Sequence, residues 1–350
     1  MRITFILPGY PWKPGGGAKI VYEIANNLVK RGYQVNIVHP RNIGPTDNIK
    51  AMIRNWRDTL LKPRINWVAI DPRVNLLFVA EPTAAHIPDA DFVFATYTPL
   101  AEYVLNYPAA KGKKCYLFQH NEFWFAKEKL AAIWRSDLLK VVVSRWLAEI
   151  GQAFGAKDIY YIPDAIDQGL FRVTKPIAGR PLRVSMLFSR WAWKGSADGV
   201  KALEEAKQKL PALAAVLFGI DKRTSAIPKW IEYYQAPAPK DLVENIYNGS
   251  SIHLCPSHSE GFALPPAEAL ACGCALASTD CGGNRDYAED GVTALLSPPK
   301  EPAALARNIL RLAADEALRA RLAKAGGQRI EQFNWQRVAD LYEKFFAANS

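Results

Sequence analysis

Long apolar runs and cysteine are both scarce in this chain of 350 residues. No apolar run approaches the roughly 20 residues that a bilayer-spanning helix needs, so we expect no transmembrane segment. The apolar start of the chain soon meets Pro8, Gly9 and Pro11 instead of a small-residue cleavage site, so we expect no signal peptide. Five cysteines, an odd number in a long chain, are typical of a reducing compartment. The sequence therefore predicts a cytoplasmic protein.

Metal-ligating patterns are also scarce. No two cysteines have the spacing of a zinc knuckle. Asp89 and Asp91 could together hold a divalent cation, but they directly precede the apolar run 92–95, where a turn at the edge of a strand is the expected structure. We therefore predict no metal ion and no other cofactor.

Repeats and low-complexity tracts are missing as well, and 49% hydrophobic with 22% charged residues is the composition of a globular protein. The net charge of +10 is compatible with nucleic acid, an anionic membrane or a phosphorylated substrate. No aromatic and basic recognition motif supports nucleic acid. Basic residues gather in 41–67 together with Trp56 and Trp67, and this segment fits either peripheral contact with an anionic membrane or a basic binding loop.

Short apolar runs alternate with helical patterns twice along the chain. The runs show no polar alternation, as expected for strands of a parallel sheet covered by helices on both faces. Expected strands are 2–7, 33–38, 76–79, 92–95, 114–118, 140–143, 183–188, 214–218, 251–255 and 275–278. Expected helices are 20–29, 199–210, 240–247, 265–271, 303–314 and 336–348.

This alternation predicts an α/β protein with two doubly wound, Rossmann-like domains. We place the first domain at 1–170 and the second at 171–335. The last helix, within 336–350, is expected to pack back towards the first domain.

The most informative stretch is 256–286, PSHSEGFALPPAEALACGCALASTDCGGNRD. Glu260 and Glu268 lie on either side of an expected helix start, and Pro265 and Pro266 suit the first turn of that helix. The amino end of a helix attracts anions through its free N–H groups and its dipole. A carboxylate accepts two hydrogen bonds from a vicinal diol, so this pattern suits a nucleotide sugar.

The stretch resembles the retaining glycosyltransferases of family 4, which have the GT-B fold of two Rossmann-like domains facing a central cleft and a motif of Glu, seven residues and Glu. Further matches are the loop 15–17 after the first strand, the connector 162–167, the pair Arg190 and Lys194, and the closing Phe-Asn-Trp at 333–335 before the last helix. The resemblance therefore extends over most of the chain.

The resemblance implies that the first domain receives the acceptor and that the second domain binds the nucleotide sugar. In the second domain, Glu268 would accept from the ribose hydroxyls and Glu260 from the hydroxyls of the transferred sugar. Arg190 and Lys194 would neutralise the diphosphate leaving group. The backbone around four consecutive residues would contact sugar and phosphate: Gly261, Phe262, Ala263 and Leu264.

In the first domain, His120 matches a histidine that relatives place near the sugar. Gly16 and Gly17 would let the backbone approach the diphosphate or the acceptor. Simpler structural roles stay open for each candidate. The two glutamates could be solvated charges at a helix end, and Arg190 could stack or cap the surface. His120 could be a hydrogen-bonded structural histidine, and Gly16 and Gly17 could form a plain turn.

The implied activity is retaining, metal-independent transfer of a sugar from a UDP-, GDP- or dTDP-linked donor. The acceptor would be a glycan or a lipid-linked saccharide in cell-surface polysaccharide biosynthesis, and the enzyme would be cytoplasmic or peripheral at the inner face of the membrane. Alternatives are a GT-B sugar phosphorylase, a nucleotide-sugar epimerase, and an inactive protein that binds nucleotide sugars or glycans.

Overall fold

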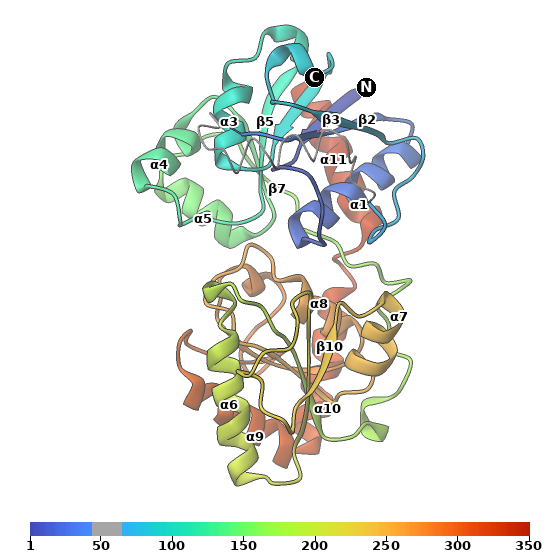
Figure 1. The fold of residues 1–350 in the computed structure, drawn as a ribbon, viewed down its shortest axis with the longest axis vertical. Helices are drawn as coiled ribbons and strands as arrows, with labels where there is room; N and C mark the ends of the chain where they lie inside the picture. Colours follow the sequence, from blue (N-terminus) through green and yellow to red (C-terminus); the bar gives the residue numbers. More distant parts are fainter. Residues whose placement is uncertain (44–64) are drawn as a thin grey trace. The chain divides into compact units, whose positions relative to one another are not determined.

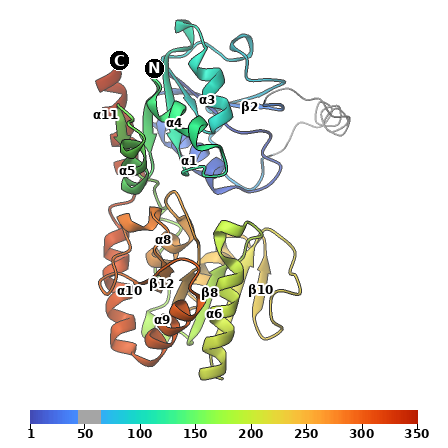
Figure 2. The ribbon, with the colours of Figure 1, turned by 90° about the vertical axis from the view of Figure 1, so that its left-hand side faces the viewer.

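The computed structural model describes residues 1–43 and 65–350. The chain forms two compact units, one of residues 1–164 with 335–350 and the other of residues 165–334. Each unit is a parallel sheet with helices packed on it, shown in Figures 1 and 2. The predicted class, α/β with two doubly wound Rossmann-like domains, is confirmed.

The first unit contains, within the described residues, seven strands in the order β3-β2-β1-β4-β5-β6-β7, all paired in parallel. The order reverses between β1 and β4, because the chain first builds the sheet in one direction and then crosses back to build the other. A crevice forms outside the carboxyl ends of the strands at such a point. The strands are β1 (Arg2–Ile6), β2 (Gln34–Pro40), β3 (Asn75–Val79), β4 (Phe92–Ala95), β5 (Lys113–Phe118), β6 (Leu139–Val142) and β7 (Ile159–Tyr161).

Five α-helices of the first unit belong to the described residues: α1 (Gly16–Lys30), α3 (Thr98–Leu105), α4 (Lys127–Arg135), α5 (Arg145–Ala153) and α11 (Trp335–Asn349). Short 3-10 turns occur at η1 (Ala84–His86) and η2 (Ala109–Lys111). The helix α11 lies beside α1 in Figure 1, and Arg31 at the end of α1 forms an ion pair with Glu343 of α11.

Aromatic side chains attach α11 to the first sheet. Phe92 and Phe94 of β4 pack against Phe345 and Phe346 of α11, with ring centroids between 4.9 and 6.4 Å apart. The final helix therefore belongs to the first unit, although the whole second unit precedes it in the chain.

The boundary between the units falls between Asp164 and Ala165, a few residues before the position expected from the sequence. Two contacts explain the difference. The N–H of Ile166 donates to the carbonyl of Phe333 at 2.8 Å, and the side chain of Gln168 donates to the carbonyl of Ile330 at 3.2 Å. Ile166 and Gln168 are thus bonded to the second unit, although the expected boundary after residue 170 places them in the first domain.

The second unit repeats the doubly wound plan with the parallel order β10-β9-β8-β11-β12-β13, reversing between β8 and β11. Its strands are β8 (Arg183–Leu187), β9 (Ala214–Gly219), β10 (Glu232–Gln235), β11 (Ile252–Cys255), β12 (Ala275–Thr279) and β13 (Leu295–Ser297). Its helical elements are η3 (Ile177–Gly179), η4 (Ala192–Lys194), α6 (Ser196–Lys209), α7 (Pro239–Asp241), the π-helical turn η5 (Leu242–Tyr247), α8 (Leu264–Ala271), η6 (Gly283–Asp286), α9 (Pro302–Ala314) and α10 (Glu316–Ile330).

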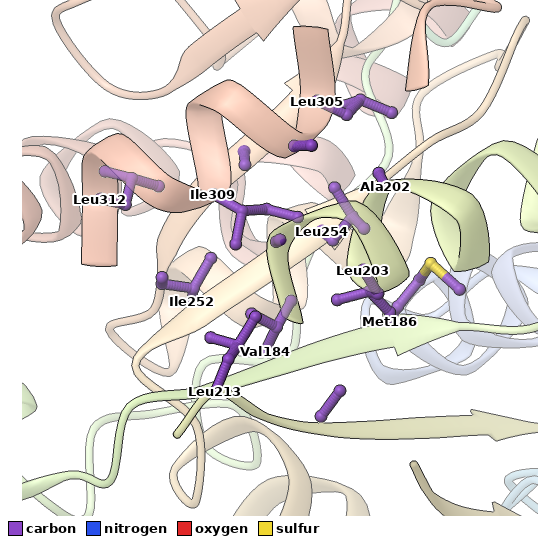
Figure 3. Packing of buried hydrophobic residues seen from close by; sticks show 14 of the residues in the cluster. Val184, Met186, Ala202, Leu203, Leu213, Ile252, Leu254, Leu305, Ile309 and Leu312 are labelled. Atoms are coloured by element: carbon purple, nitrogen blue, oxygen red, sulfur yellow. The ribbon is translucent and has the colours of Figure 1, made fainter. Parts of the chain in front are cut away.

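The core of the second unit lies between its sheet and the pair α6 and α9. Val184, Ile252 and Leu254 from the central strands meet Leu203 of α6 and Ile309 of α9, and all five are fully buried (Figure 3). The helix α10 packs directly against α8 and β12 (Figure 2). Burial of both faces explains why the strands lack polar alternation.

The helix α10 is an element that the sequence pattern conceals, because Gly326 and Gly327 interrupt it. Glycine inside a helix is normally destabilising. At position 326, however, a Cβ atom would lie 2.4 Å from a methyl carbon of Leu270 in α8. The glycine lets two helices approach closely, which only the packed structure reveals.

Asp164 gives a prediction about stability and pH. Burial raises the pKa of this carboxyl group to about 8. An unfolded aspartate ionises near pH 4, so between about pH 4 and 8 the folded state holds a proton that the unfolded state has lost, and stability falls as the pH rises through this window. We expect Asp164→Asn to raise the melting temperature by several degrees at pH 8 and by less at pH 5. Thermal melts at both values check this, with Asp137→Asn as an exposed control in the same unit. A gain of equal size at both pH values would contradict the buried-proton explanation.

Candidate active site

The candidate site of the second unit lies where β8 and β11 end side by side. These two strands are parallel neighbours at the point where the strand order reverses. The loop after β8 leads through η4 into α6, and the loop after β11 leads into α8. Both loops therefore emerge at the carboxyl edge of the sheet, the usual place for a ligand in a doubly wound domain.

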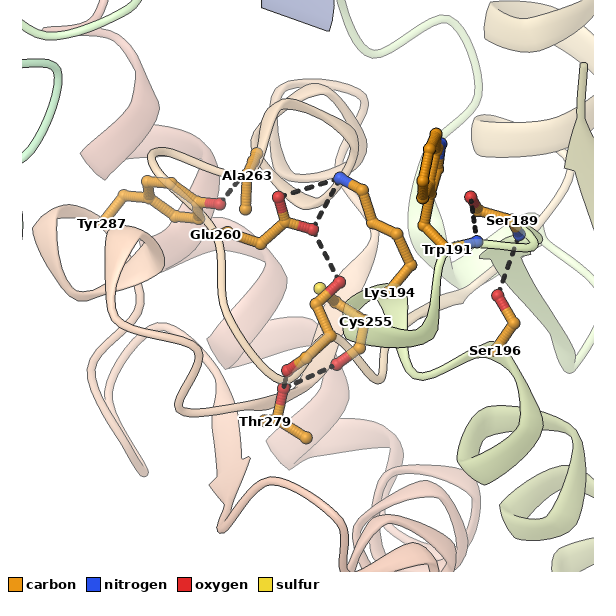
Figure 4. A network of polar contacts seen from close by, with 10 residues as sticks. Ser189, Trp191, Lys194, Ser196, Cys255, Glu260, Ala263, Thr279 and Tyr287 are labelled. Atoms are coloured by element: carbon orange, nitrogen blue, oxygen red, sulfur yellow. Dashed lines mark hydrogen bonds and ion pairs between the residues drawn. The ribbon is translucent and has the colours of Figure 1, made fainter. Parts of the chain in front are cut away.

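An ion pair between Lys194 and Glu260 joins these two loops. The ammonium nitrogen of Lys194 lies 2.8 Å from each carboxylate oxygen of Glu260, and the Ser257 hydroxyl donates to the same carboxylate at 2.7 Å (Figure 4). Glu260 is only 6% exposed. Burial lowers the pKa of Lys194, but the adjacent carboxylate outweighs it, and the pKa ends above its ordinary value. Lys194 is therefore held as a cation at neutral pH.

The loop that carries Lys194 is fixed from both sides. The carbonyl of Trp193 accepts from the N–H of His258 at 2.7 Å, and the His258 ring lies 2.7 Å from a carboxylate oxygen of Asp198. Gly195 has a φ of 60° and faces the carbonyl of Pro256 so closely that a side chain would collide with it. The position of the ammonium group is thus set by packing between the two loops.

The backbone of Glu260 is tied to the loop after β12. Its N–H donates to the carbonyl of Cys281 at 2.9 Å, and its own carbonyl accepts from Gly283 at 3.2 Å. Gly283 leaves no room for a Cβ atom against the carbonyl of Gly261. The buried amide of Asn284 holds the same loop by donating to the carbonyl of Thr279 at 2.8 Å.

The start of α8 is shaped by Ala263, whose φ of 68° lies in the left-handed region. Its carbonyl accepts from the hydroxyl of Tyr287 at 2.6 Å. Pro265 and Pro266 follow in the first turn and have no N–H, so an anion at this end would meet the backbone of residues 261–264. This is the segment that the sequence predicts to contact sugar and phosphate.

The side chain of Phe262 has a structural role. It is 2% exposed and packs against the rings of Tyr287 and Phe333 at 5.4 Å. The side chain is therefore taken up by packing, and contact of a ligand with the backbone of Phe262 stays a prediction.

Glu268 lies on α8, 6% exposed, and accepts a hydrogen bond from the hydroxyl of Tyr247 at 3.1 Å. Burial, followed by the charge of Glu268, raises the pKa of Tyr247 well above its ordinary value, so its hydroxyl keeps its proton and donates. The carboxylate is thus oriented from behind by a buried phenol. A glutamate on the solvated surface of a helix would have no such partner, so the solvated helix-end alternative is wrong for both Glu260 and Glu268.

Arg190 is placed differently from Lys194. Its side chain is 62% exposed and its Nε lies 3.8 Å from a carboxylate oxygen of Asp221. The structure therefore does not bring Arg190 into the ion pair of Lys194 and Glu260. The role of Arg190 in binding a diphosphate stays a prediction.

The candidates of the first unit gather at the carboxyl ends of β1 and β5. Gly16 and Gly17 begin α1, and the side-chain amide of Gln119 donates to the carbonyl of Gly17 at 3.0 Å. A Cβ atom on Gly17 would lie 2.8 Å from the amide oxygen of Gln119, so a side chain there would need Gln119 to move. His120 follows in the same loop, and its Nδ1 accepts from the N–H of Glu122 at 3.3 Å.

Glu122 is a buried carboxylate that the sequence pattern did not single out. It accepts from the backbone N–H of Thr98 at 3.0 Å and from the hydroxyl of Tyr116 at 2.9 Å. Burial raises its pKa, which these hydrogen bonds partly offset. Glu122 holds the start of α3 against the loop that carries His120, and a φ of 51° at Glu122 marks the sharp turn there.

Two buried histidines and the aspartates Asp89 and Asp91 have structural partners. His39 contacts the hydroxyl of Tyr22 at 3.0 Å and His253 that of Ser185 at 3.0 Å; burial lowers the pKa of His39 to about 4 and that of His253 to about 3. Asp89 pairs with Lys111, and Asp91 accepts from the backbone of Arg2. Among residues 1–43 and 65–350, no three His, Cys, Asp or Glu side chains cluster as metal ligands would.

Most of the basic segment 41–67 falls outside the described residues, including Trp56 and its neighbours. Trp67 is described, and its indole N–H donates to the carbonyl of Pro11 at 3.3 Å. In the described part of the chain, no helix is both long and apolar enough to cross a bilayer.

Comparison with known families finds a match within the second unit. The model of the family Glycosyl transferases group 1 matches residues 192–329, a range that begins at η4 and includes Lys194, Glu260 and Glu268. The D-inositol 3-phosphate glycosyltransferase of Frankia alni is 36% identical over 106 residues, which are 30% of this chain and 26% of that protein. The enzyme of the same name from Streptomyces bingchenggensis is 33% identical over 106 residues, 30% of this chain and 23% of that protein. The matched part spans about a quarter of the length of these relatives.

Solved structures of other proteins superpose on nearly the whole of this chain. Sucrose-phosphate synthase from Thermosynechococcus elongatus superposes with a TM-score of 0.75 at 18% identity, covering 99% of both chains. Anabaena HepE in complex with UDP has a TM-score of 0.75 at 15% identity, covering 99% of this chain and 100% of that one. The likeness is one of fold, and the fold is that of GT-B glycosyltransferases.

Proposed function

We propose that the protein is a retaining glycosyltransferase that moves a sugar from a nucleotide-sugar donor to a glycan or lipid-linked acceptor. The observation that carries the proposal is the ion pair of the half-buried Lys194 with the buried Glu260 at the carboxyl edge of the second sheet. It lies within the range matched by the glycosyl transferases group 1 model. The site thus combines a fixed cation, a buried carboxylate and a segment of backbone N–H groups.

Lys194 would act on the leaving group. A lysine ammonium has three N–H donors, and two of them are directed to Glu260. The third can bind an oxygen of the nucleoside diphosphate, whose negative charge grows as the bond to the sugar breaks. Because the cation is held before the substrate arrives, little reorganisation is needed, and the chemistry can proceed without a metal ion.

Glu260 would hold the sugar and would not attack it. Its carboxylate is neutralised by Lys194 and bonded by Ser257, which makes it a poor nucleophile but leaves lone pairs for sugar hydroxyls. Without a covalent intermediate, attack on the same face as departure is the route to retention that we favour. Glu268, oriented by Tyr247, would accept from the ribose hydroxyls.

The donor class is supported by relatives of the same fold: HepE has been solved with UDP and with UDP-glucose. We propose a UDP-, GDP- or dTDP-sugar for this protein. We further propose cell-surface polysaccharide biosynthesis as its setting, in the cytoplasm or at the inner face of the membrane.

A thermal-shift panel with UDP, GDP, dTDP and ADP and their sugars tests the proposal. A ligand that binds only the folded state raises the melting temperature by mass action, and saturation at 100 times Kd adds about 2.7 kcal/mol of stability. We expect a rise of several degrees with one nucleotide family and transfer to an acceptor in a mass-spectrometric assay. A flat panel would count against the nucleotide site. Release of a sugar 1-phosphate from a glycan and inorganic phosphate would instead indicate a phosphorylase. Conversion of the nucleotide sugar to its epimer, with no acceptor needed, would indicate an epimerase.

A further inference from the structure

Trp191 is the most exposed large apolar side chain in the described residues, at 62%. Single exposed hydrophobic residues are common on protein surfaces and indicate nothing by themselves. An exposed aromatic ring indicates a binding surface when it is packed against a second ring and held in one orientation. Trp191 stacks on Trp193, with ring centroids 4.7 Å apart and planes inclined by 27°. One face of Trp191 is therefore backed by a second indole, while most of the ring remains in contact with solvent.

The ring is held in place by the loop that carries it. The N–H of Trp191 donates to the Ser189 hydroxyl at 3.3 Å, and the N–H of Ser189 donates to the Ser196 hydroxyl at 2.9 Å (Figure 4). The carbonyl of Trp193 is bonded to His258, as described above. A flat surface that is ordered in advance loses little conformational entropy on binding.

Trp191 also lies on the same turn as Lys194. It is the residue before η4, and its carbonyl accepts from the N–H of Lys194 at 3.0 Å. The indole and the ammonium group that contacts Glu260 lie on the same side of the loop, as Figure 4 shows.

We propose that Trp191 is a stacking platform for a pyranose ring of the acceptor, so that the acceptor is a saccharide at the point of transfer. This inference rests on the proposed function. A pyranose has an apolar face of C–H groups and a rim of hydroxyls, which suits an indole face surrounded by water.

The position favours the acceptor over the sugar donor. The groups expected to hold the nucleotide sugar, Glu260 and Glu268, are buried carboxylates that recognise hydroxyls. Trp191 lies at the outer end of the same loop and is mostly exposed. A donor bound to the carboxylates would still leave the indole free for the second substrate.

The test compares Trp191→Ala and Trp191→Phe with Val292→Ala, which removes an exposed apolar side chain elsewhere in the second unit. Methyl glycosides of glucose, rhamnose and N-acetylglucosamine and their short oligomers, at millimolar concentration, serve as acceptor probes. Binding is followed by saturation-transfer NMR and transfer by mass spectrometry. UDP-sugar hydrolysis without an acceptor and the thermal shift with UDP report on the donor side.

We expect Trp191→Ala to raise the acceptor KM roughly 10- to 50-fold, since stacking and the loss of buried aromatic area both contribute. Trp191→Phe should recover part of the loss, and Val292→Ala should have no effect. Donor hydrolysis and the UDP shift should change less than twofold in all three variants.

Three outcomes would contradict the proposed stacking of the acceptor on Trp191. An unchanged acceptor KM in Trp191→Ala would show that the indole does not contact the acceptor. An equal loss in the UDP shift would assign the indole to the nucleobase. Absence of any saccharide signal with the wild-type protein would exclude a saccharide acceptor at this surface. If the wild-type protein fails to hydrolyse or bind any nucleotide sugar, the proposed function itself fails, and this is distinguishable from the three outcomes above.

Discussion

Replacing Lys194 with methionine is expected to lower the turnover of sugar transfer about 100- to 1,000-fold, the usual effect of deleting one preorganised group that stabilises charge in the transition state. Methionine keeps the length and apolar stem of lysine and removes only the ammonium group. The nucleotide sugar should still bind, because Glu268 and the backbone of 261–264 are unchanged. Steady-state kinetics with saturating donor measure the effect as a fall in kcat.

The same change leaves the buried Glu260 carboxylate without its cation, which can cost about 3–5 kcal/mol of stability. The double variant Lys194→Met with Glu260→Gln is the matched control, since a neutral amide needs no counter-charge. We expect it to recover most of the melting temperature and none of the turnover. If Lys194→Met were folded and transferred sugar at the wild-type rate, the leaving-group role would be wrong. Recovery of turnover in the double variant would show that the loss came from folding.

Replacing Glu268 with glutamine is expected to weaken binding of the nucleotide about 10- to 100-fold. Hydrogen bonds to a charged acceptor contribute about 1.5–3 kcal/mol, and the amide offers only one oxygen. Calorimetric titration with the nucleotide that gives the largest thermal shift measures the change in Kd. Because Glu268 lies away from the reacting bond in this proposal, kcat at saturating donor should fall much less than it does for Lys194→Met.

Tyr247→Phe separates direct contact from orientation. It deletes the hydroxyl that donates to Glu268 while keeping the buried ring. We expect about a tenfold loss of nucleotide affinity or less, with Glu268 still able to bind the ribose. If Tyr247→Phe lowered affinity as strongly as Glu268→Gln, the carboxylate would act mainly through its partner. If neither variant altered affinity, the ribose assignment would be contradicted.

Glu260 and Glu268 were singled out in the sequence by their local spacing, whereas Lys194 was indicated only by the resemblance to family 4 glycosyltransferases. Glu260 and Glu268 lie around one helix start, where prolines and small residues mark the turn. The strands flanking them are continuous apolar runs, and these also could be predicted, since burial on both faces leaves a clear trace in composition.

The residues that hold these candidate side chains in place could not be predicted from local spacing. Asn284 holds the loop of Glu260 by donating a hydrogen bond from its side-chain amide to the carbonyl of Thr279. Arg180 donates to the carbonyls of Tyr247 and Cys272 behind Glu268. Each bond joins segments far apart in the chain or depends on a turn that brings them together. A buried Arg180 satisfied by carbonyls looks, in sequence, like any surface arginine.

By itself, the sequence determined the fold class and the two-domain plan and singled out Glu260 and Glu268 as candidates, because strand burial, helix starts and the spacing of carboxylates are local properties. Only the tertiary structure decided that Lys194 is neutralised by Glu260, that Arg190 points to Asp221, and that Trp191 presents a backed and exposed ring. Ion pairing, burial and ring stacking depend on which loops meet at the edge of a sheet. That meeting is set by the parallel order of β8 and β11, which packing of the whole domain establishes.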